Sequence, residues 1–243
     1  MSTKIILLIM FFLVSWMTPT ALADVSFTSS VDILEHSVNL TISEKYTVLD
    51  AESLRMDLDI DGSGLVDGNE LEIFESNFIA NRSDQFLGYL EIDGNASSTW
   101  LESVDISFQN AQGDVDEDEL FVRTVVIYEF DQSLSSGEHD VLILGHPLID
   151  HMQIILPEGM SPISFDGLDN SSLISENGRM VLEGASGVRS FMVGEKPTFE
   201  YAVFIEMYRE PFYKKAFFLP LLILVEILLA SLGLYIFKMN KIK

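Results

Sequence analysis

The segment 198-TFEYAVFIEM-207 carries the pattern on which the fold prediction rests. Apolar residues occupy every second position from Phe199 to Met207, and this alternation places them on one face of a half-buried β-strand. The β-branched and aromatic residues of the segment are also the types enriched in strands. We therefore expect a strand here, with one face against a core and the other toward solvent.

The same alternation recurs along most of residues 25–207, in segments separated by short turn sequences such as SSGE and ENG. The clearest of these segments are 103-SVDISF-108, 121-FVRTVVIYEF-130, 140-DVLIL-144 and 152-MQIIL-156. Many short alternating strands joined by turns are typical of an antiparallel sandwich. The sequence thus predicts a mainly β fold, with an antiparallel β-sandwich-like domain.

One segment departs from this pattern. In 68-GNELEIFESNFIANRSDQFLGYL-90, Leu71, Phe74 and Phe78, and also Ile79, recur at helical spacing. We expect one helix there, because a repeat of three to four residues places side chains on one helical face. The preceding segment, 53-SLRMDLD-59, alternates with period two and is predicted to be a strand.

The N-terminal end of the chain is strongly apolar. Lys4 is followed by the apolar run IILLIMFFLVSWM and then by TPTALA, with small residues at Ala21 and Ala23. A positive charge, an apolar run and small residues before a cleavage point form the pattern of a secretory signal peptide. We expect residues 1–23 to be that signal peptide, with cleavage after Ala23.

A second apolar stretch, residues 216–237, is interrupted only by Glu226 and Ser231. About 20 apolar residues suffice to cross a bilayer, so we expect a transmembrane helix here. The lysines of residues 238–243 suit a cytoplasmic tail. Together with the signal peptide, this single span places residues 24–211 outside the cell as an ectodomain. The charged ending KMNKIK argues against a GPI signal, which ends in its hydrophobic tail.

Charge is distributed unevenly along the chain. Of 14 Lys and Arg residues four lie outside residues 24–215, and of 38 Asp and Glu residues only Glu226 does, leaving 10 basic and 37 acidic residues and a net charge of −27. Such a surface repels nucleic acid, which excludes a nucleic-acid-binding function, and it attracts cations. The chain has no cysteine, so its stability must come from core burial, from bound metal, or from both.

The segment 59-DIDGSGLVDGNE-70 concentrates oxygen-bearing side chains. Calcium prefers six to eight oxygen ligands, and alternate side chains of a tightly wound loop can converge on one ion. Gly64 allows the sharp turn that such a loop needs. The candidate ligands are the side chains of Asp59, Asp61 and Ser63, the Leu65 carbonyl, Asp67 directly or through water, and both oxygens of Glu70.

In the order and spacing of these residues the segment resembles the EF-hand calcium loop. The resemblance implies bound Ca²⁺ and an apolar Val66 that faces inward. It covers only the loop and the helix after it, since the segment before it alternates as a strand. The alternative interpretation is an acidic, solvent-exposed turn rich in Asp and Gly.

A single loop between a strand and a helix has no second unit to move against, whereas calcium sensors open a paired helix–loop–helix. We therefore expect a structural clamp, with the affinity of an extracellular module, a dissociation constant of about 0.1–1 mM. Folding and calcium binding should then be linked.

Two further groups of residues give only weak indications of a metal site. The segment 114-DVDEDE-119 lacks a glycine and spaced ligands, so we interpret it as a solvated turn. His139, His146 and His151 have no spacing that indicates a zinc site.

Glu226 falls near the middle of the predicted span, where an ionised carboxylate costs at least about 2.5 kcal/mol. We expect it to contact a polar or basic group of another membrane helix, in a homo-oligomer or a larger complex. The alternative is a protonated acid that is tolerated in a single span.

Two functions follow from these features. The first is a calcium-binding, membrane-anchored extracellular protein with a binding or accessory role and no enzymatic activity. The alternative is a membrane-anchored ectoenzyme, a hydrolase that uses carboxylates or the bound cation. The sequence has no Gly-x-Ser-x-Gly, phosphate-loop or zinc-protease motif, and the predicted ligand set leaves little room for the open position that a catalytic metal needs. The sequence therefore favours the first function.

Overall fold

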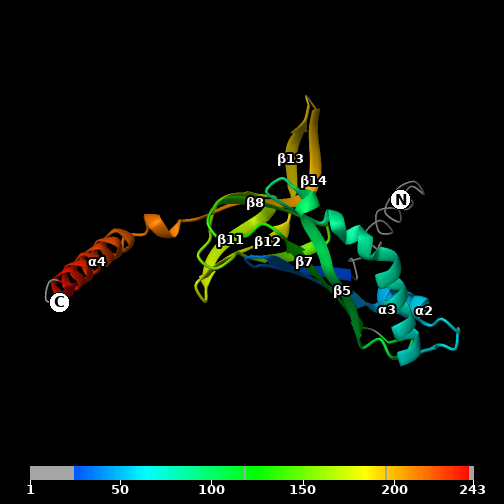
Figure 1. The fold of residues 1–243 in the computed structure, drawn as a ribbon. Coiled ribbons are helices and arrows are strands. Elements are labelled where there is room, and N and C mark those ends of the chain that lie inside the picture. The colour runs from blue at the N-terminus through cyan, green and yellow to red at the C-terminus, as the bar shows by residue number, and fades with distance from the viewer. Residues whose placement is uncertain (1–24, 118, 195, 241–243) are drawn as a thin grey trace, which may run out of the picture.

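The computed structural model describes residues 25–117, 119–194 and 196–240, and it shows a mainly β chain built from two packed sheets (Figure 1). This confirms the predicted sandwich-like β architecture. The predicted signal peptide, residues 1–23, and the last three residues of the predicted tail lie outside the described residues.

The larger sheet has seven strands in the order β11-β12-β9-β1-β2-β7-β5. Their bounds are β1 Val25–Ile33, β2 Ser37–Thr47, β5 Thr99–Gln109, β7 Glu119–Phe130, β9 Ile149–Ile155, β11 Leu168–Glu176 and β12 Arg179–Ser186. Neighbouring strands are antiparallel except β1 and β9, which run parallel, with Val31 opposite Ile154. The prediction of a purely antiparallel sandwich was wrong on this pair. Alternation within a strand carries no information on the direction of its partner, and β9 enters from the other sheet rather than through a hairpin.

The smaller sheet has five strands, in the order β10-β14-β8-β4 with β13 paired to β14. Their bounds are β4 Leu90–Ile92, β8 Gly137–Leu144, β10 Ser161–Asp166, β13 Val188–Val193 and β14 Lys196–Arg209. A further two-residue pair joins β3 (Leu65–Val66) to β6 (Gly113–Asp114).

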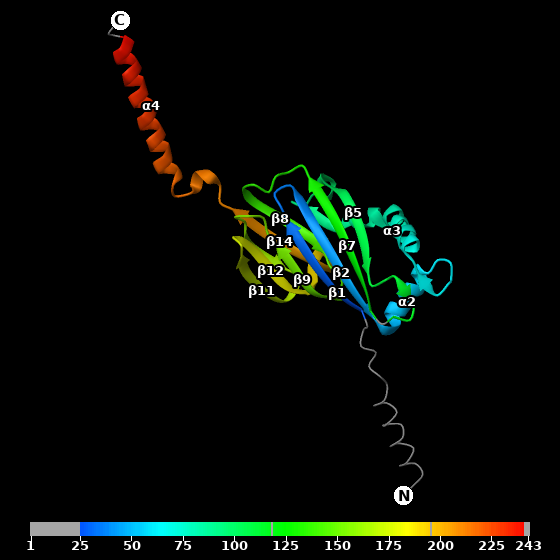
Figure 2. The same ribbon diagram turned by 90° about the horizontal axis from the view of Figure 1, so that it is seen from below.

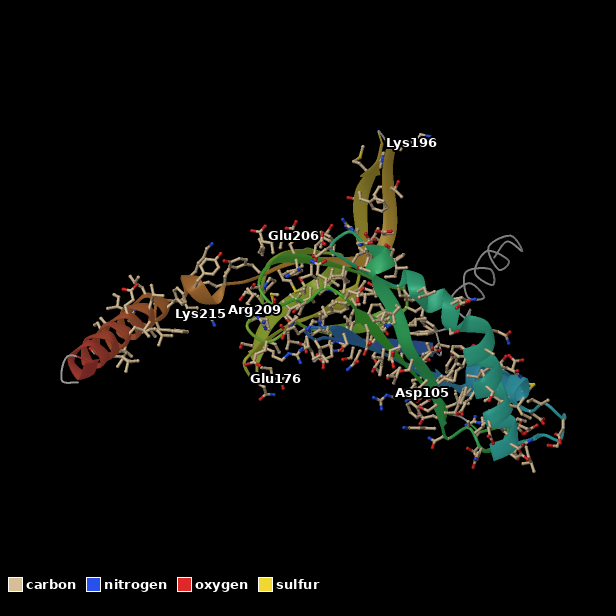
Figure 3. The ribbon with its side chains drawn as sticks, viewed as in Figure 1. Asp105, Glu176, Lys196, Glu206, Arg209 and Lys215 are labelled. Carbon is tan, nitrogen blue, oxygen red and sulfur yellow. The ribbon has the colours of Figure 1, made fainter. Side chains whose placement is uncertain are left out.

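Strand β14, which contains the segment 198–207, has two different halves. Val203, Ile205 and Met207 are fully buried between the sheets, as their alternation predicts. Phe199 is 66% exposed, because this half of β14 pairs only with β13 and the two strands form a hairpin that projects from the body. Figure 3 shows Lys196 at the tip of this hairpin, far from Arg209 at the other end of β14.

Helices cover the part of the larger sheet that the smaller sheet leaves free, and Figure 2 shows them beside β5 and β7. The helical segments are α2 Val48–Leu58, α3 Gly68–Arg82 and α4 Phe218–Asn240, with the short 3-10 turns η1 Ser83–Gly88, η2 Ala96–Ser98 and η3 Phe212–Lys214. The prediction of a single ectodomain helix was therefore wrong, since α2 and α3 both contribute.

The buried apolar residues form two clusters. The sandwich core lies between the sheets and includes Leu40, Val126, Val141 and Ile205. The helix core lies between α2, α3 and the strands β5 and β7, and it includes Ala51, Leu58, Leu71, Leu120 and Val122. Phe78 of α3 packs against both clusters, so α3 joins the two.

The strand predicted at 53–59 is instead the second half of α2. Ala51, Arg55 and Leu58 are each 0% exposed, while Met56 is 54% exposed. The buried face thus follows helical spacing, with Leu54 packed against the same cluster. Period-two alternation of Leu54, Met56 and Leu58 was misleading, because the buried face includes the charged residue Arg55 and leaves Met56 exposed.

Helix α3 lies where the sequence predicts a helix, and Leu71, Phe74 and Phe78 face the sheet. Leu71 is buried, and the Phe74 ring meets the Phe108 ring edge to face with centroids 5.6 Å apart. Ile79 is only partly buried and belongs to neither core cluster. The helix thus stands against β5, and it carries the final residues of the loop that precedes it.

Helix α4 projects away from the two sheets (Figure 1). Among the residues that the structure describes in full, no helix is both long enough and apolar enough to cross a membrane.

The two halves of β14 should respond differently to truncation. We expect Ile205→Ala to lower the free energy of unfolding by about 2–5 kcal/mol, because it leaves a cavity between the sheets. Phe199→Ala, which removes an exposed ring from the hairpin, should change it by about 0.5 kcal/mol or less. Urea unfolding of the purified full-length protein measures both values, and equal losses would contradict the assignment of 199 to a solvent-exposed hairpin.

Candidate calcium site

The loop Asp59–Glu70 connects the end of α2 to the start of α3 at one end of the molecule (Figure 1). Helix α2 ends through a hydrogen bond from the Asp59 amide to the Arg55 carbonyl, 2.8 Å long. The predicted ligand segment is therefore flanked by helices on both sides.

Three predicted ligands come together in this loop. One carboxylate oxygen each from Asp59, Asp61 and Glu70 can be chosen so that all lie within 4.8 Å of one another. Within the described part of the chain, no other three His, Asp or Glu side chains bring their ligand atoms this close together. Like charges this close repel strongly unless a cation lies among them.

Backbone amides of the loop hold the Asp59 carboxylate in place. Its Oδ2 accepts a hydrogen bond from the Gly64 amide at 2.8 Å, and its Oδ1 accepts one from the Ser63 amide at 3.0 Å. These bonds, with the Gly64 amide as the largest contributor, lower the pKa of Asp59 below its ordinary 3.8. Gly64 reaches this position with a φ of +82°, a conformation that disfavours a residue with a Cβ. The loop thus presents Asp59 as a carboxylate.

Glu70 is nearly buried and joins the two ends of the loop. Its Oε1 accepts from the Asp61 amide at 3.2 Å and its Oε2 accepts from the Asp67 amide at 2.9 Å. The Asp67 side chain in turn accepts from the Asn69 and Glu70 amides, so the pair forms a capping box at the start of α3. Asp67 therefore caps the helix and does not join the three grouped carboxylates.

The remaining predicted ligands lie between these residues. The Ser63 hydroxyl is 3.5 Å from Asp59 Oδ1 and donates to the Leu65 carbonyl at 3.1 Å. Val66 is 3% exposed and packs in the helix core, facing inward as the resemblance implies.

The 110–119 connection between β5 and β7 packs against this loop. Leu65 and Val66 pair with Asp114 and Gly113 through β3 and β6, and the Val115 amide donates to the Gly64 carbonyl at 3.3 Å. The segment 114–119 was predicted to be a solvated turn, and the side chains of Asp114, Asp116, Glu117 and Glu119 are exposed. The backbone of Gly113 to Val115 nevertheless forms part of the support for the candidate site.

Arg55 of α2 is the main link between that connection and the helices. Its side chain is fully buried and donates to the carbonyls of Asn110 and Glu119 at 2.5 Å each, and to the Glu117 carbonyl. The Glu117 carboxylate lies 3.7 Å away and is half exposed. Sequence reasoning missed Arg55, and the signal for it was its place on the helical face formed by Ala51, Leu54 and Leu58.

The three histidines considered for zinc do not converge. His139 on β8 pairs its Nδ1 with Asp93 Oδ2 at 2.9 Å, whereas His151 lies on β9 and His146 lies between the two strands.

Removing Arg55 should destabilise the protein strongly. We expect Arg55→Met to lower the free energy of unfolding by about 3–5 kcal/mol, because three carbonyl oxygens lose a charged donor at a buried site. Glu117→Gln tests the exposed ion pair alone and should cost less than about 1 kcal/mol. Urea unfolding compares the two variants, and a small loss for Arg55→Met would show that the carbonyl contacts contribute little.

Comparisons with known proteins do not place this chain in a family. No family model matches it, and no curated protein matches it. Among solved structures it is similar to AChBP from Bulinus truncatus, at 9% identity, with 77% of this chain and 87% of that chain covered and a TM-score of 0.22. A TM-score this low does not establish a common fold, so nothing of that protein transfers to this chain.

Proposed function

We propose that this chain is a calcium-binding, membrane-anchored extracellular protein in which the loop Asp59–Glu70 acts as a structural clamp. In this proposal it has a binding or accessory role rather than an enzymatic one. The observation that carries the proposal is the convergence of the Asp59, Asp61 and Glu70 carboxylates in a loop between two helices.

The local architecture supports calcium as the ion. A helix, a loop of twelve positions and a second helix are the parts of an EF-hand, and a hard divalent cation is bound there by oxygen ligands. Asp59, Asp61 and Glu70 would hold the ion, and the Ser63 hydroxyl and the Leu65 carbonyl lie beside them. Asp67, engaged as a helix cap, would contribute through a water molecule, a common arrangement at this loop position. The ion would neutralise the clustered carboxylates.

The packing of α2 and α3 supports a clamp over a sensor. Both helices contribute buried residues to one helix core, Ala51 and Leu58 from α2 and Leu71 from α3. Opening the two helices, as sensors do, would expose that core and break the β3–β6 pairing. A bound ion would instead hold both helices against β5 and β7.

Calcium should raise the stability of the folded protein. At a calcium concentration about 30 times the dissociation constant, ligand binding to the native state contributes about 2 kcal/mol. We expect a melting temperature that rises with calcium from about 0.1 mM upward, measured on the full-length protein after removal of metal with EDTA. An unchanged melting temperature up to about 10 mM would contradict the clamp.

Glu70→Gln is the specific test of the ligand set. Gln retains an oxygen that can cap the Asp67 amide, but it removes the charge and one ligand oxygen, so the calcium-induced shift should be lost or greatly reduced. Glu72→Gln, an exposed acid on the same helix, is the matched control and should respond as the wild type does. A shift that survives in Glu70→Gln would place the ion elsewhere.

The membrane anchor in this proposal is residues 216–237, supported by the apolar sequence of that stretch. The end of β14 that precedes it is fixed to the ectodomain. Arg209 donates to the Ser135 carbonyl at 2.8 Å and to the Glu158 carbonyl, and Figure 3 shows Lys215 beyond it, toward α4. A force on the anchor would therefore be transmitted to two loops of the sandwich.

Glu226 should mediate contact between membrane helices. In the described part of the chain it has no hydrogen-bond or ion-pair partner, whereas Ser231 satisfies its hydroxyl by donating to the Ile227 carbonyl at 2.8 Å. A lone acid in the bilayer gains from a polar partner on another helix. We expect Glu226→Leu to reduce the size of the detergent-solubilised assembly, measured by light scattering, and Ser231→Ala to leave it unchanged. Equal sizes for Glu226→Leu and wild type would exclude this contact.

A further inference from the structure

The inner face of the larger sheet carries polar side chains at one place, between the sandwich core and the helix core. Ser29, Ile42 and Thr124 lie side by side on β1, β2 and β7. Glu44 lies two residues after Ile42 on β2, on the same face of the sheet. Ser29 and Thr124 are buried, at 4% and 3% exposed. An inward-facing acid breaks the apolar alternation of β2, in which Val38, Leu40 and Ile42 precede it.

A cavity of about 250 Å³ lies at this seam. One side is the inner face of the larger sheet, and the other is formed by α3, η1 and the residues that follow β8. It lies where strand β8 of the smaller sheet ends at Leu144 and beside Phe78 of α3. An apolar cavity of about 150 Å³ is enough to hold a benzene molecule, so this cavity can take a somewhat larger ligand.

The walls of the cavity are aromatic and aliphatic. Phe78, Phe86 and Tyr89 form a chain of ring contacts, with centroids 6.4 Å apart for the first pair and 5.4 Å for the second. Phe27 lies on β1 in the larger sheet, and the centroid of its ring is 5.7 Å from that of the His146 ring. Ring faces attract cations as well as apolar groups.

Glu44 is the charged group of this cavity, and it lacks a counterion. Its carboxylate accepts a hydrogen bond from the Tyr46 hydroxyl, and among the described residues no cation forms an ion pair with it. His146 Nδ1 accepts a hydrogen bond from the Leu148 amide at 3.2 Å, so this nitrogen is turned to the backbone rather than to Glu44. Burial raises the pKa of Glu44 above its ordinary 4.5, against smaller lowering contributions from Tyr46 and His146. A cation placed here would offset that cost of burial.

We propose that this cavity binds a small amphipathic amine, with its apolar body against the aromatic wall and its ammonium group on the Glu44 carboxylate. Charge complementarity selects the amine. A carboxylic acid would bring a second negative charge to Glu44, and the net charge of −27 on residues 24–215 repels anions and attracts cations before they reach the cavity. This site is separate from the calcium loop, and its ligand does not depend on calcium.

The test compares three probes with one carbon chain and different head groups: hexylamine, hexanol and hexanoate. Binding is measured by calorimetry on the full-length protein, with calcium present throughout. We expect hexylamine to bind at least about tenfold more tightly than hexanol, because a charged hydrogen bond is made only by the amine. Hexanoate should bind most weakly.

Glu44→Gln should remove the preference for hexylamine and leave hexanol binding unchanged. Glu129→Gln is the matched control, because it removes the same charge from the outward face of the neighbouring strand β7, and it should bind as the wild type does. Equal affinity of the wild type for hexylamine and hexanol, tighter binding of hexanoate, or no binding of any probe would overturn the proposal.

A measurement on the wild type avoids dependence on the folding of Glu44→Gln. On addition of hexylamine, the methyl resonances of Ile42 and Thr124 should shift, since both residues line the cavity. Saturable shifts confined to other methyl groups would place the amine elsewhere and overturn the assignment. Loss of the calcium-induced stabilisation would leave these results unaffected, so the two proposals fail separately.

Discussion

The inner face of the seven-stranded sheet must be covered along its whole width, and the smaller sheet is too narrow to do so. Strands β4, β8 and β14 cover the part near β1, β2 and β9, and they form the sandwich core with it. The part formed by β5 and the start of β7 is left to α2 and α3. Because exposed apolar surface is costly, the helices and the loop that joins them are required by the sheet rather than appended to it.

This requirement explains why the loop Asp59–Glu70 lies where it does. The two helices that it joins must both pack on one cluster, so the loop reverses the chain within a few residues and brings its acids together. Arg55 and the β3–β6 pair fix the β5–β7 connection against the same place. The repulsion among Asp59, Asp61 and Glu70 is tolerated because backbone amides stabilise Asp59 and Glu70. A cation would turn that repulsion into attraction.

The unequal layers also leave a seam, and the polar residues of the inner face gather there. At the boundary of the two apolar clusters, the inner face carries polar side chains such as Ser29 and Thr124, whereas the neighbouring positions of β7 on this face are the aliphatic Val122 and Val126. Glu44 lies beside them, with the Tyr46 hydroxyl as its donor. The loop and the seam thus differ in environment, one held by backbone amides and the other lined by aromatic rings, yet both place carboxylates where a cation is favoured.

The sequence by itself determined the strands and the candidate ligands, because both depend on spacing along the chain. Alternation located β5, β7, β8, β9 and β14, and the positions of Asp59, Asp61 and Glu70 in a twelve-residue segment indicated their convergence. The tertiary structure decided whatever depends on neighbours distant in sequence. It made 53–58 part of a helix, because Arg55 finds the carbonyls of Asn110, Glu117 and Glu119 and can be buried there. It also left Phe199 in solvent, set β9 parallel to β1, and placed Glu44 in a cavity. Alternation along a strand assigns each side chain to one face of the sheet, but it does not specify what packs against that face.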